Sequence, residues 1–107
     1  MINTLKQLLG LGPKPDYAAL VKQGAIVLDV RTAGEYAGGH LKGSINISVD
    51  RLRENLHQLT DKNRPIITCC ASGMRSASAK SILKAGGFTQ VHNGGRWTSL
   101  KNKLSEG

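Results

Sequence analysis

The chain has 107 residues, 39% of them hydrophobic, with two tyrosines, one tryptophan and one phenylalanine, which allows one domain with a mainly aliphatic core. Fifteen Lys and Arg residues against seven Asp and Glu residues give a net charge of +8, which favours anionic substrates or acidic partner surfaces. The basic residues are spread along the chain without a nucleic-acid motif, so nucleic acid is not an expected partner.

Apolar patterns and glycines predict an alternation of helices and strands. The continuous apolar run "AIVLDV" is typical of a strand buried on both faces of a parallel sheet, and the apolar spacing in "VDRLRENLHQL" is typical of a helix. This alternation predicts an α/β domain with a central, mostly parallel sheet flanked by helices, where ligands bind beyond the carboxyl ends of the strands. In chain order we expect a helix over 16–24, a strand over 25–30, a helical turn over 31–39, a strand over 44–48, a helix over 49–59, a strand over 65–69, a helix from Ser76 to the glycines at 86–87, a strand over 89–93 and a helix over 96–104.

Residues 1–15 are interpreted as a helix or linker ahead of a domain that covers residues 16–104. The opening segment "MINTLKQLLGLGPKP" is typical of a short amphipathic helix and lacks the small-residue cleavage site of a signal peptide. No apolar stretch approaches the ~20 residues that cross a bilayer, so no transmembrane segment is expected. Free cysteines suit a reducing cytoplasm, with the periplasm as the alternative if a signal was removed, and we expect a monomer.

The two cysteines of the chain, Cys69 and Cys70, are adjacent. Neighbouring residues do not readily reach disulfide geometry, and in a strand they point to opposite faces. His40, His57 and His92 are scattered without the spacing of metal ligands. We therefore expect neither a disulfide nor a zinc site, and no cofactor.

The segment "TCCASGMRS", residues 68–76, places Arg75 after the cysteines in two alternative frames, C-x4-R from Cys70 and C-x5-R from Cys69. A glycine-containing loop between a buried strand and a helix start favours anions, because its amides turn inward and the helix dipole adds positive potential. In the Cys70 frame Gly73 falls in mid-loop, where positive φ lets an amide face the sulfur.

Arg75 adds a permanent cation to this loop, so we expect a larger thiolate fraction at neutral pH than in a free cysteine. Cys69 lies within the strand and is interpreted as a small buried hydrophobe. Cys70 lies at the strand's exit and is interpreted as the nucleophile, not as a buried hydrophobe. The other candidate substrate-binding residues are those of the loop: Ala71, Ser72, Gly73, Met74 and Ser76.

Residues outside the loop are candidates for supporting roles. Asp29 and Arg31 are expected on opposite faces of the strand, and hence not as one catalytic pair. One of them is a candidate to support the loop electrostatically, although a structural salt bridge or cap at the strand end is the preferred interpretation. Glu35 is interpreted as a helix-surface or capping residue, and His40 as a packing or hydrogen-bonding residue.

Two long segments resemble the rhodanese family over about residues 16–100. The first, "AIVLDVRTAGEYAGGHLKGSINIS", is similar to the family's aspartate–arginine strand end followed by Glu-Tyr, Gly-His and Gly-x-Ile-Asn-Ile. The second, "PIITCCASGMRSASAKSILKAGGFTQVHNGGRW", is similar to its active-site strand, loop and helix. Lys42 and Ser44 depart from the usual proline and alanine of the family, away from the loop. The resemblance implies a rhodanese-like three-layer domain.

The resemblance also implies that Cys70 takes a sulfane sulfur from thiosulfate or polysulfide as a persulfide and hands it to a thiophilic acceptor, such as cyanide or a protein thiol. Sulfurtransferases of the family have the C-x4-R loop, whereas phosphatases and arsenate reductases on this fold have the longer loop of the Cys69 frame. Their chemistry is one alternative, and a rhodanese-like regulatory binding module is another. Without an added basic residue in the loop, the donor stays open between thiosulfate, polysulfide and a protein persulfide.

Overall fold

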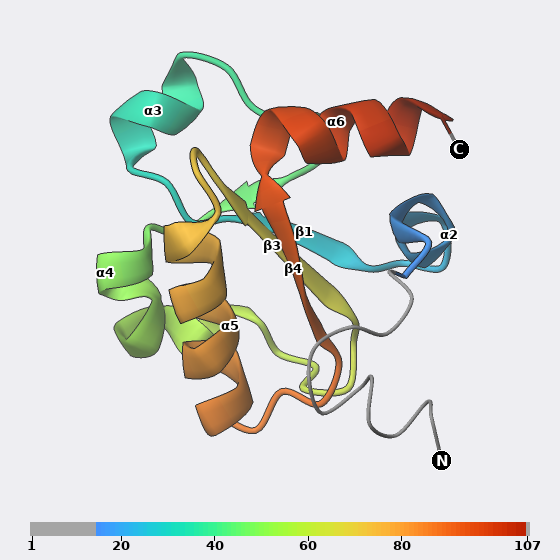
Figure 1. Cartoon of the computed structure of the whole chain (residues 1–107). Helices are drawn as coiled ribbons and strands as arrows, with labels where there is room; N and C mark the ends of the chain where they lie inside the picture. Colours follow the sequence, from blue (N-terminus) through green and yellow to red (C-terminus); the bar gives the residue numbers. More distant parts are fainter. Residues whose placement is uncertain (1–14, 107) are drawn as a thin grey trace, which may run out of the picture.

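The computed structural model describes residues 15–106, which form a four-stranded parallel sheet with helices on both faces (Figure 1). The strand order is β2-β1-β3-β4, and every neighbouring pair is parallel. The predicted α/β fold with a central parallel sheet is confirmed. The elements are α2 (Tyr17–Lys22), β1 (Ile26–Asp29), α3 (Ala33–Ala37), β2 (Ile45–Asn46), α4 (Val49–Leu52), the 3-10 helix η1 (Arg53–Gln58), β3 (Ile66–Cys70), α5 (Met74–Ala85), β4 (Val91–Arg96) and α6 (Trp97–Glu106).

Two groups of helices cover the two faces of the sheet and make a three-layer domain (Figure 1). On one face, Leu52 of α4 and Leu83 of α5 pack in a cluster with Leu28 of β1. On the other face, Tyr17 of α2 and Leu100 of α6 pack in a second cluster. Successive residues of a strand alternate between the faces, so each central strand contributes to both clusters.

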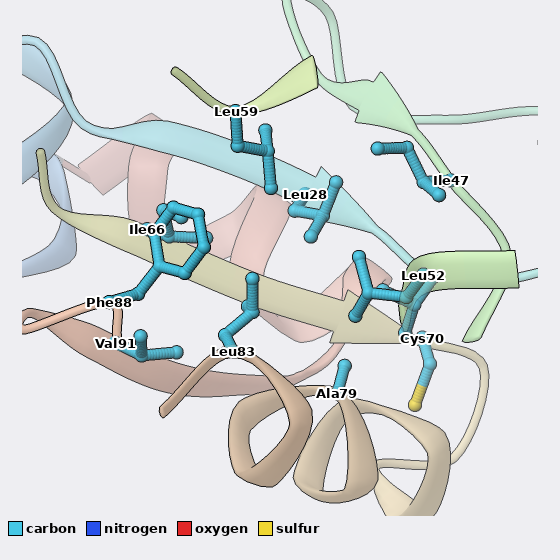
Figure 2. Packing of buried hydrophobic residues seen from close by; sticks show 11 residues of the cluster. Leu28, Ile47, Leu52, Leu59, Ile66, Cys70, Ala79, Leu83, Phe88 and Val91 are labelled. Carbon is cyan, nitrogen blue, oxygen red and sulfur yellow. The ribbon is translucent and has the colours of Figure 1, made fainter. Parts of the chain in front are cut away.

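The central strand β3 shows this alternation and separates the two cysteines. All five of its residues are buried. Ile66 and Cys70 belong to the cluster under α5, as Figure 2 shows, whereas Ile67 and Cys69 belong to the cluster under α6. The predicted opposite orientation of the adjacent cysteines is therefore confirmed.

The helix predicted over 49–59 is divided into α4 and η1. Asn55 has non-helical backbone angles of φ −117° and ψ 15°. Its side-chain amide donates to the carbonyl oxygen of Arg51 at 2.8 Å. Side chains that bond to nearby backbone groups compete with the regular helical ladder, which explains why the apolar spacing alone predicted too long a helix.

The elements around the cysteine loop also differ from their predicted bounds. α5 begins at Met74 rather than Ser76, because Gly73 occupies the N-cap in a left-handed conformation (φ 96°, ψ −20°). β3 includes Cys70 as its last residue, and β4 extends to Arg96. The helix or linker predicted over 1–15 lies outside the described residues apart from residue 15, and the domain limits 16–104 stay a prediction.

Candidate active site

The sulfur of Cys70 lies at the end of β3 and accepts two backbone hydrogen bonds. Gly73 N–H donates to Cys70 Sγ at 2.9 Å, and Ser76 N–H donates to the same sulfur at 3.2 Å. Both amides belong to the turn and first helical turn that follow the strand, where backbone N–H groups have no partner within the helix. The site therefore presents two donors and a helix N-terminus to one sulfur, which favours negative charge there.

Cys70 is nevertheless fully buried, with an exposed fraction of 0%, and it packs in the apolar cluster beneath α5. The expectation that this residue is not a buried hydrophobe is wrong as far as its burial is concerned. The loop after it turns back over the sulfur, which is what places the Gly73 amide at hydrogen-bond distance. The same backbone that donates to the sulfur thus also covers it.

Cys69 has a different environment on the opposite face of the sheet. Its side chain is also 0% exposed, and burial, followed by the negative charge of Asp29, raises the pKa of its thiol to about 12. A thiol with such a pKa stays protonated at neutral pH, and a protonated thiol is a poor nucleophile. The interpretation of Cys69 as a small buried hydrophobe is confirmed. Both cysteines are free thiols.

Gly73 makes the inward amide possible. Its φ of 96° lies in the left-handed region, which L side chains rarely adopt. A Cβ at this position would meet no atom closer than Gly95 Cα at 4.0 Å, so the requirement for glycine is conformational rather than steric. The predicted function of this glycine in the loop agrees with its backbone geometry.

A buried hydrogen-bond chain supports the loop from below. Ser76 Oγ donates to Asn93 Oδ1 at 2.6 Å and lies 2.7 Å from Thr68 Oγ1. Gly95 N–H also donates to Asn93 Oδ1, at 2.9 Å, which identifies that atom as the acceptor oxygen. These hydrogen bonds hold Ser76, whose N–H faces the cysteine sulfur, against β3 and β4.

The sequence analysis missed Asn93. Asn93 lies in regular register opposite Thr68, and the pairing shifts just after it, since Cys70 pairs with Arg96. One extra residue on β4 opposes β3 there, the arrangement of a β-bulge, and bulges redirect side chains near sites. The Gly-Gly pair that follows Asn93 was a visible signal for such an irregularity.

Arg75 does not stand as an unpaired cation beside the sulfur. Its two terminal guanidinium nitrogens donate to the two carboxylate oxygens of Glu35, at 2.7 and 2.9 Å. The Arg75 hydrogen bond, followed by the Thr32 amide, lowers the pKa of Glu35 to about 2. Glu35 also forms a capping box with Thr32 at the start of α3, which confirms its interpretation as a capping residue and adds an ion pair that was not predicted.

Asp29 and Arg31 form one buried ion pair, so the expectation of opposite faces is wrong. Arg31 Nε lies 3.0 and 3.1 Å from the two Asp29 carboxylate oxygens, and a terminal nitrogen lies 2.8 Å from one of them. Residues two apart in a strand share a face, which already brings Asp29 and Arg31 to the same side. Because β1 ends at Asp29, the Arg31 side chain is also free to fold back onto the Asp29 carboxylate. The structural salt bridge preferred for this strand end is confirmed.

This ion pair anchors the segment that carries Glu35. Arg31 donates to the carbonyl oxygen of Gly39 at 2.7 Å and to that of Glu35 at 3.3 Å, and its guanidinium lies 4.7 Å from the ring centre of Trp97. The hydrogen bond with Asp29 is the main cause that raises the pKa of Arg31. Arg31 therefore contacts the backbone of the segment that carries Glu35, the partner of Arg75.

The remaining predicted site residues lie on the outside of the loop. Ala71 and Ser72 are exposed, and Met74 is 79% exposed. His40 stacks on Tyr36 with ring centres 3.7 Å apart and bonds to its carbonyl oxygen at 2.7 Å, which confirms its packing and hydrogen-bonding interpretation.

A hollow of about 480 Å³ lies elsewhere, between the start of α3, the end of β2 and the α4–η1 segment. No residue of the cysteine loop lines it, so the sulfur does not face this hollow. Seven of its lining residues have polar or charged side chains: Thr32, Asn46, Ser48, Asp50, Arg51, Asn55 and Gln58.

Within residues 15–106, no three His, Cys, Asp or Glu side chains gather closely enough to bind a metal ion. In the same range, no helix combines the length and apolarity that a bilayer span requires.

The fold and the site together define a class of protein: a parallel α/β domain with a cysteine held by loop amides at the carboxyl end of its central strand. The family model of the rhodanese-like domain matches residues 14–95. The chain therefore belongs to the rhodanese-like domain family, and the resemblance seen in the sequence is confirmed.

The relatives of the chain are named for different activities. The chain is 34% identical over 80 residues to the thiosulfate sulfurtransferase GlpE of Pseudomonas fluorescens, covering 74% of this chain and 72% of that protein. It is 36% identical over 69 residues to the thiosulfate sulfurtransferase PspE of Escherichia coli, covering 64% of this chain and 66% of PspE. It is 35% identical over 78 residues to a tRNA uridine(34) hydroxylase of Buchnera aphidicola, covering 68% of this chain but only 25% of the hydroxylase.

Among solved structures, a rhodanese with anions from E. coli is similar to the chain with a TM-score of 0.67 and 32% identity. The match covers 71% of this chain and 91% of that one. The human single-domain sulfurtransferase TSTD1 gives a TM-score of 0.68 at 21% identity, which shows the shared fold.

Proposed function

We propose that the protein is a sulfurtransferase of the thiosulfate type, which moves a sulfane sulfur from an anionic donor to a thiophilic acceptor through a persulfide on Cys70. The observation that carries this proposal is the pair of amides, from Gly73 and Ser76, that donate to the Cys70 sulfur. Donors placed in this way stabilise a thiolate, which is the nucleophilic form of cysteine. The names of GlpE and PspE support the same activity.

Sulfur transfer through Cys70 needs no redox cofactor, because each step forms one bond to sulfur and breaks another. The Cys70 thiolate attacks the outer sulfur of thiosulfate, so that a new S–S bond forms, the S–S bond of the donor breaks, and sulfite leaves with the electron pair. An acceptor such as cyanide or a thiolate then attacks the outer sulfur of the persulfide, which forms thiocyanate or a new persulfide and returns the Cys70 thiolate. The same loop amides face the sulfur in both steps.

Phosphatase chemistry in the Cys69 frame is the weaker candidate. Cys69 lies on the other face of the sheet, away from the loop amides, and its thiol has a pKa of about 12. An in-line attack on phosphate needs donors around three equatorial oxygens, and the C-x4-R loop has one residue fewer than the C-x5-R loop. A binding module without activity would not need the amides directed at Cys70.

Other residues around Cys70 have supporting roles in this transfer. Arg75 attracts the anionic donor, and the backbone of Ala71, Ser72 and Met74 completes the wall around the transferred sulfur. Asp29 and Arg31 hold α3 against the site. The protein acts as a monomer in a reducing compartment such as the cytoplasm, where its free thiols persist.

The test is a turnover assay on one preparation. Thiosulfate or polysulfide is supplied with cyanide and thiocyanate is measured, while an aryl phosphate is supplied in parallel and phosphate is measured. We expect cysteine-dependent thiocyanate that is absent in Cys70→Ser. Phosphate release that depends on a cysteine, with no thiocyanate from either donor, would contradict the proposal.

A further inference from the structure

Glu35 brings a negative charge to the cysteine loop. Its carboxylate accepts hydrogen bonds from both terminal guanidinium nitrogens of Arg75, the cation of the loop, at 2.7 and 2.9 Å. The two residues are 40 positions apart, and the pair therefore ties α5 to α3. The side chains are 33% and 37% exposed, so the pair lies at the surface of the site, where a ligand that approaches the loop also approaches Glu35.

Glu35 is held in place independently of Arg75. Its Oε1 accepts the backbone N–H of Thr32 at 3.0 Å and the Thr32 hydroxyl at 3.1 Å. The carbonyl oxygen of Glu35 accepts a hydrogen bond from a terminal nitrogen of Arg31. The buried carboxylate of Asp29 holds the Arg31 side chain in place. With its pKa lowered to about 2, the carboxylate is charged at every pH used in an assay. The loop thus faces a fixed anion rather than a freely moving one.

We propose that Glu35 is a specificity-determining residue, which offsets the charge of Arg75 and so disfavours doubly charged donors at the Cys70 loop relative to singly charged ones. The inference rests on the sulfurtransferase activity proposed above. It names the preferred donor class as singly charged sulfane-sulfur compounds, such as hydrogen disulfide ion or a thiosulfonate. Thiosulfate, as a dianion, stays a donor but binds less well at this loop than a monoanion of the same kind.

The size of the effect follows from charge. Across roughly 8 Å of water-like medium, one fixed negative charge weakens the binding of a dianion about fivefold and that of a monoanion about twofold. A structural role of Glu35 would change both donors by the same factor. The ratio between a dianionic and a monoanionic donor therefore isolates the proposed role.

Thiosulfate and methanethiosulfonate make a matched pair of donors for the test, with charges of −2 and −1 and the same outer sulfur. Cys70 attacks that sulfur in both, and sulfite leaves in one case and methanesulfinate in the other. We expect Glu35→Gln to lower KM about fivefold for thiosulfate and about twofold for methanethiosulfonate, with kcat little changed. Glu35→Asp, which keeps the charge, should leave the ratio of the two KM values near that of the wild type.

A second measurement detects the effect of the Glu35 charge without any sulfur transfer. Iodoacetate, which is negatively charged, and iodoacetamide, which is neutral, both alkylate Cys70. The rate with the neutral reagent reports how accessible the buried sulfur is. We expect Glu35→Gln to raise the ratio of the iodoacetate rate to the iodoacetamide rate about twofold. Glu54→Gln, an exposed acidic residue of η1, removes the same charge elsewhere and should leave both ratios unchanged.

Equal changes for both donors and both reagents in Glu35→Gln, or a fall in kcat at constant KM, would overturn the specificity role. Glu35→Ala serves as a second neutral variant if the glutamine variant does not fold. A wild type that forms no persulfide from any donor would contradict the proposed function instead. In that case the alkylation ratio still decides whether Glu35 controls the charge at the loop.

Discussion

Ser76 donates its backbone N–H to the sulfur of Cys70 at 3.2 Å, from the first turn of the helix that follows the cysteine loop. The same residue is fixed from below, since its hydroxyl donates to Asn93 and lies beside that of Thr68. The amide that faces the sulfur is therefore positioned by a buried side-chain network and not by the loop alone. Ser76 therefore contributes both to the stability of the fold and to the position of the amide that faces Cys70.

Replacing Ser76 by alanine removes both hydroxyl contacts and leaves Asn93 and Thr68 with fewer partners. We expect the free energy of unfolding to fall by about 1–3 kcal/mol, the usual range when buried polar groups lose a partner. Urea unfolding measures this change, and alkylation of Cys70 should slow in the same variant. Ser78→Ala, at an exposed position of the same helix, is the control. A Ser76→Ala protein as stable and as reactive as the control would contradict the positioning role.

Gly73→Ala should destabilise the protein for conformational reasons. The position has φ 96° and open space around a new Cβ, so the expected loss is the roughly 1–2 kcal/mol that a left-handed backbone imposes on an L residue. Gly34→Ala in α3, where φ is not positive and a Cβ also meets nothing, should be neutral or stabilising. Thermal unfolding of the two variants gives the comparison. Equal stability of both variants would show that the loop does not need the left-handed conformation.

Asp29→Asn breaks the ion pair with Arg31, whose two side chains are 0% and 6% exposed. Removing one partner of a buried pair leaves the other charge uncompensated, with a typical loss of about 3–5 kcal/mol. Denaturant unfolding should show this loss, whereas Asp50→Asn at an exposed position of α4 should change little. A loss below 1 kcal/mol would mean that Arg31 is held by Gly39 and Trp97 without its carboxylate.

The ion pair between Glu35 and Arg75 predicts a pH dependence of stability. The folded pKa of Glu35, about 2, lies below its ordinary value of 4.5, so its stabilising contribution is complete above about pH 4.5 and is lost as the pH falls towards 2. We expect the stability difference between wild type and Glu35→Gln to be constant near neutral pH and to vanish in acid. Unfolding curves between pH 7 and pH 2 measure it. A difference that does not change with pH would assign the contribution to the cap rather than to the charge.

The fold and the geometry of the candidate nucleophile could be predicted because they follow from local patterns. Continuous apolar runs that alternate with helical spacing specify a parallel α/β sheet. The choice of Cys70 as the candidate nucleophile follows from the position of Gly73 relative to it, and the structure gives that glycine the positive φ that the prediction requires. The same pattern predicted burial of Cys69 within the strand, which the structure confirms.

The contacts between distant segments could not be predicted in this way. Glu35 meets Arg75 across 40 residues of chain, and nothing in the local sequence of either residue specifies the partner. Asn93 bonds to Ser76 because β4 pairs with β3 in a register that places Asn93 opposite Thr68, and the local sequence of neither strand specifies that register. The error at Asp29 was of another kind, since the period of a strand already places that residue and Arg31 on one face.

The central claim, that Cys70 and not Cys69 carries the sulfur, is tested most directly by the intact mass of the protein after incubation with thiosulfate or polysulfide. The sulfur of Cys70 accepts the amides of Gly73 and Ser76, whereas Cys69 lies on the opposite face with a thiol pKa of about 12. We predict an added mass of one sulfur that is retained in Cys69→Ala and absent in Cys70→Ala. An adduct that disappears in Cys69→Ala and persists in Cys70→Ala would contradict the account.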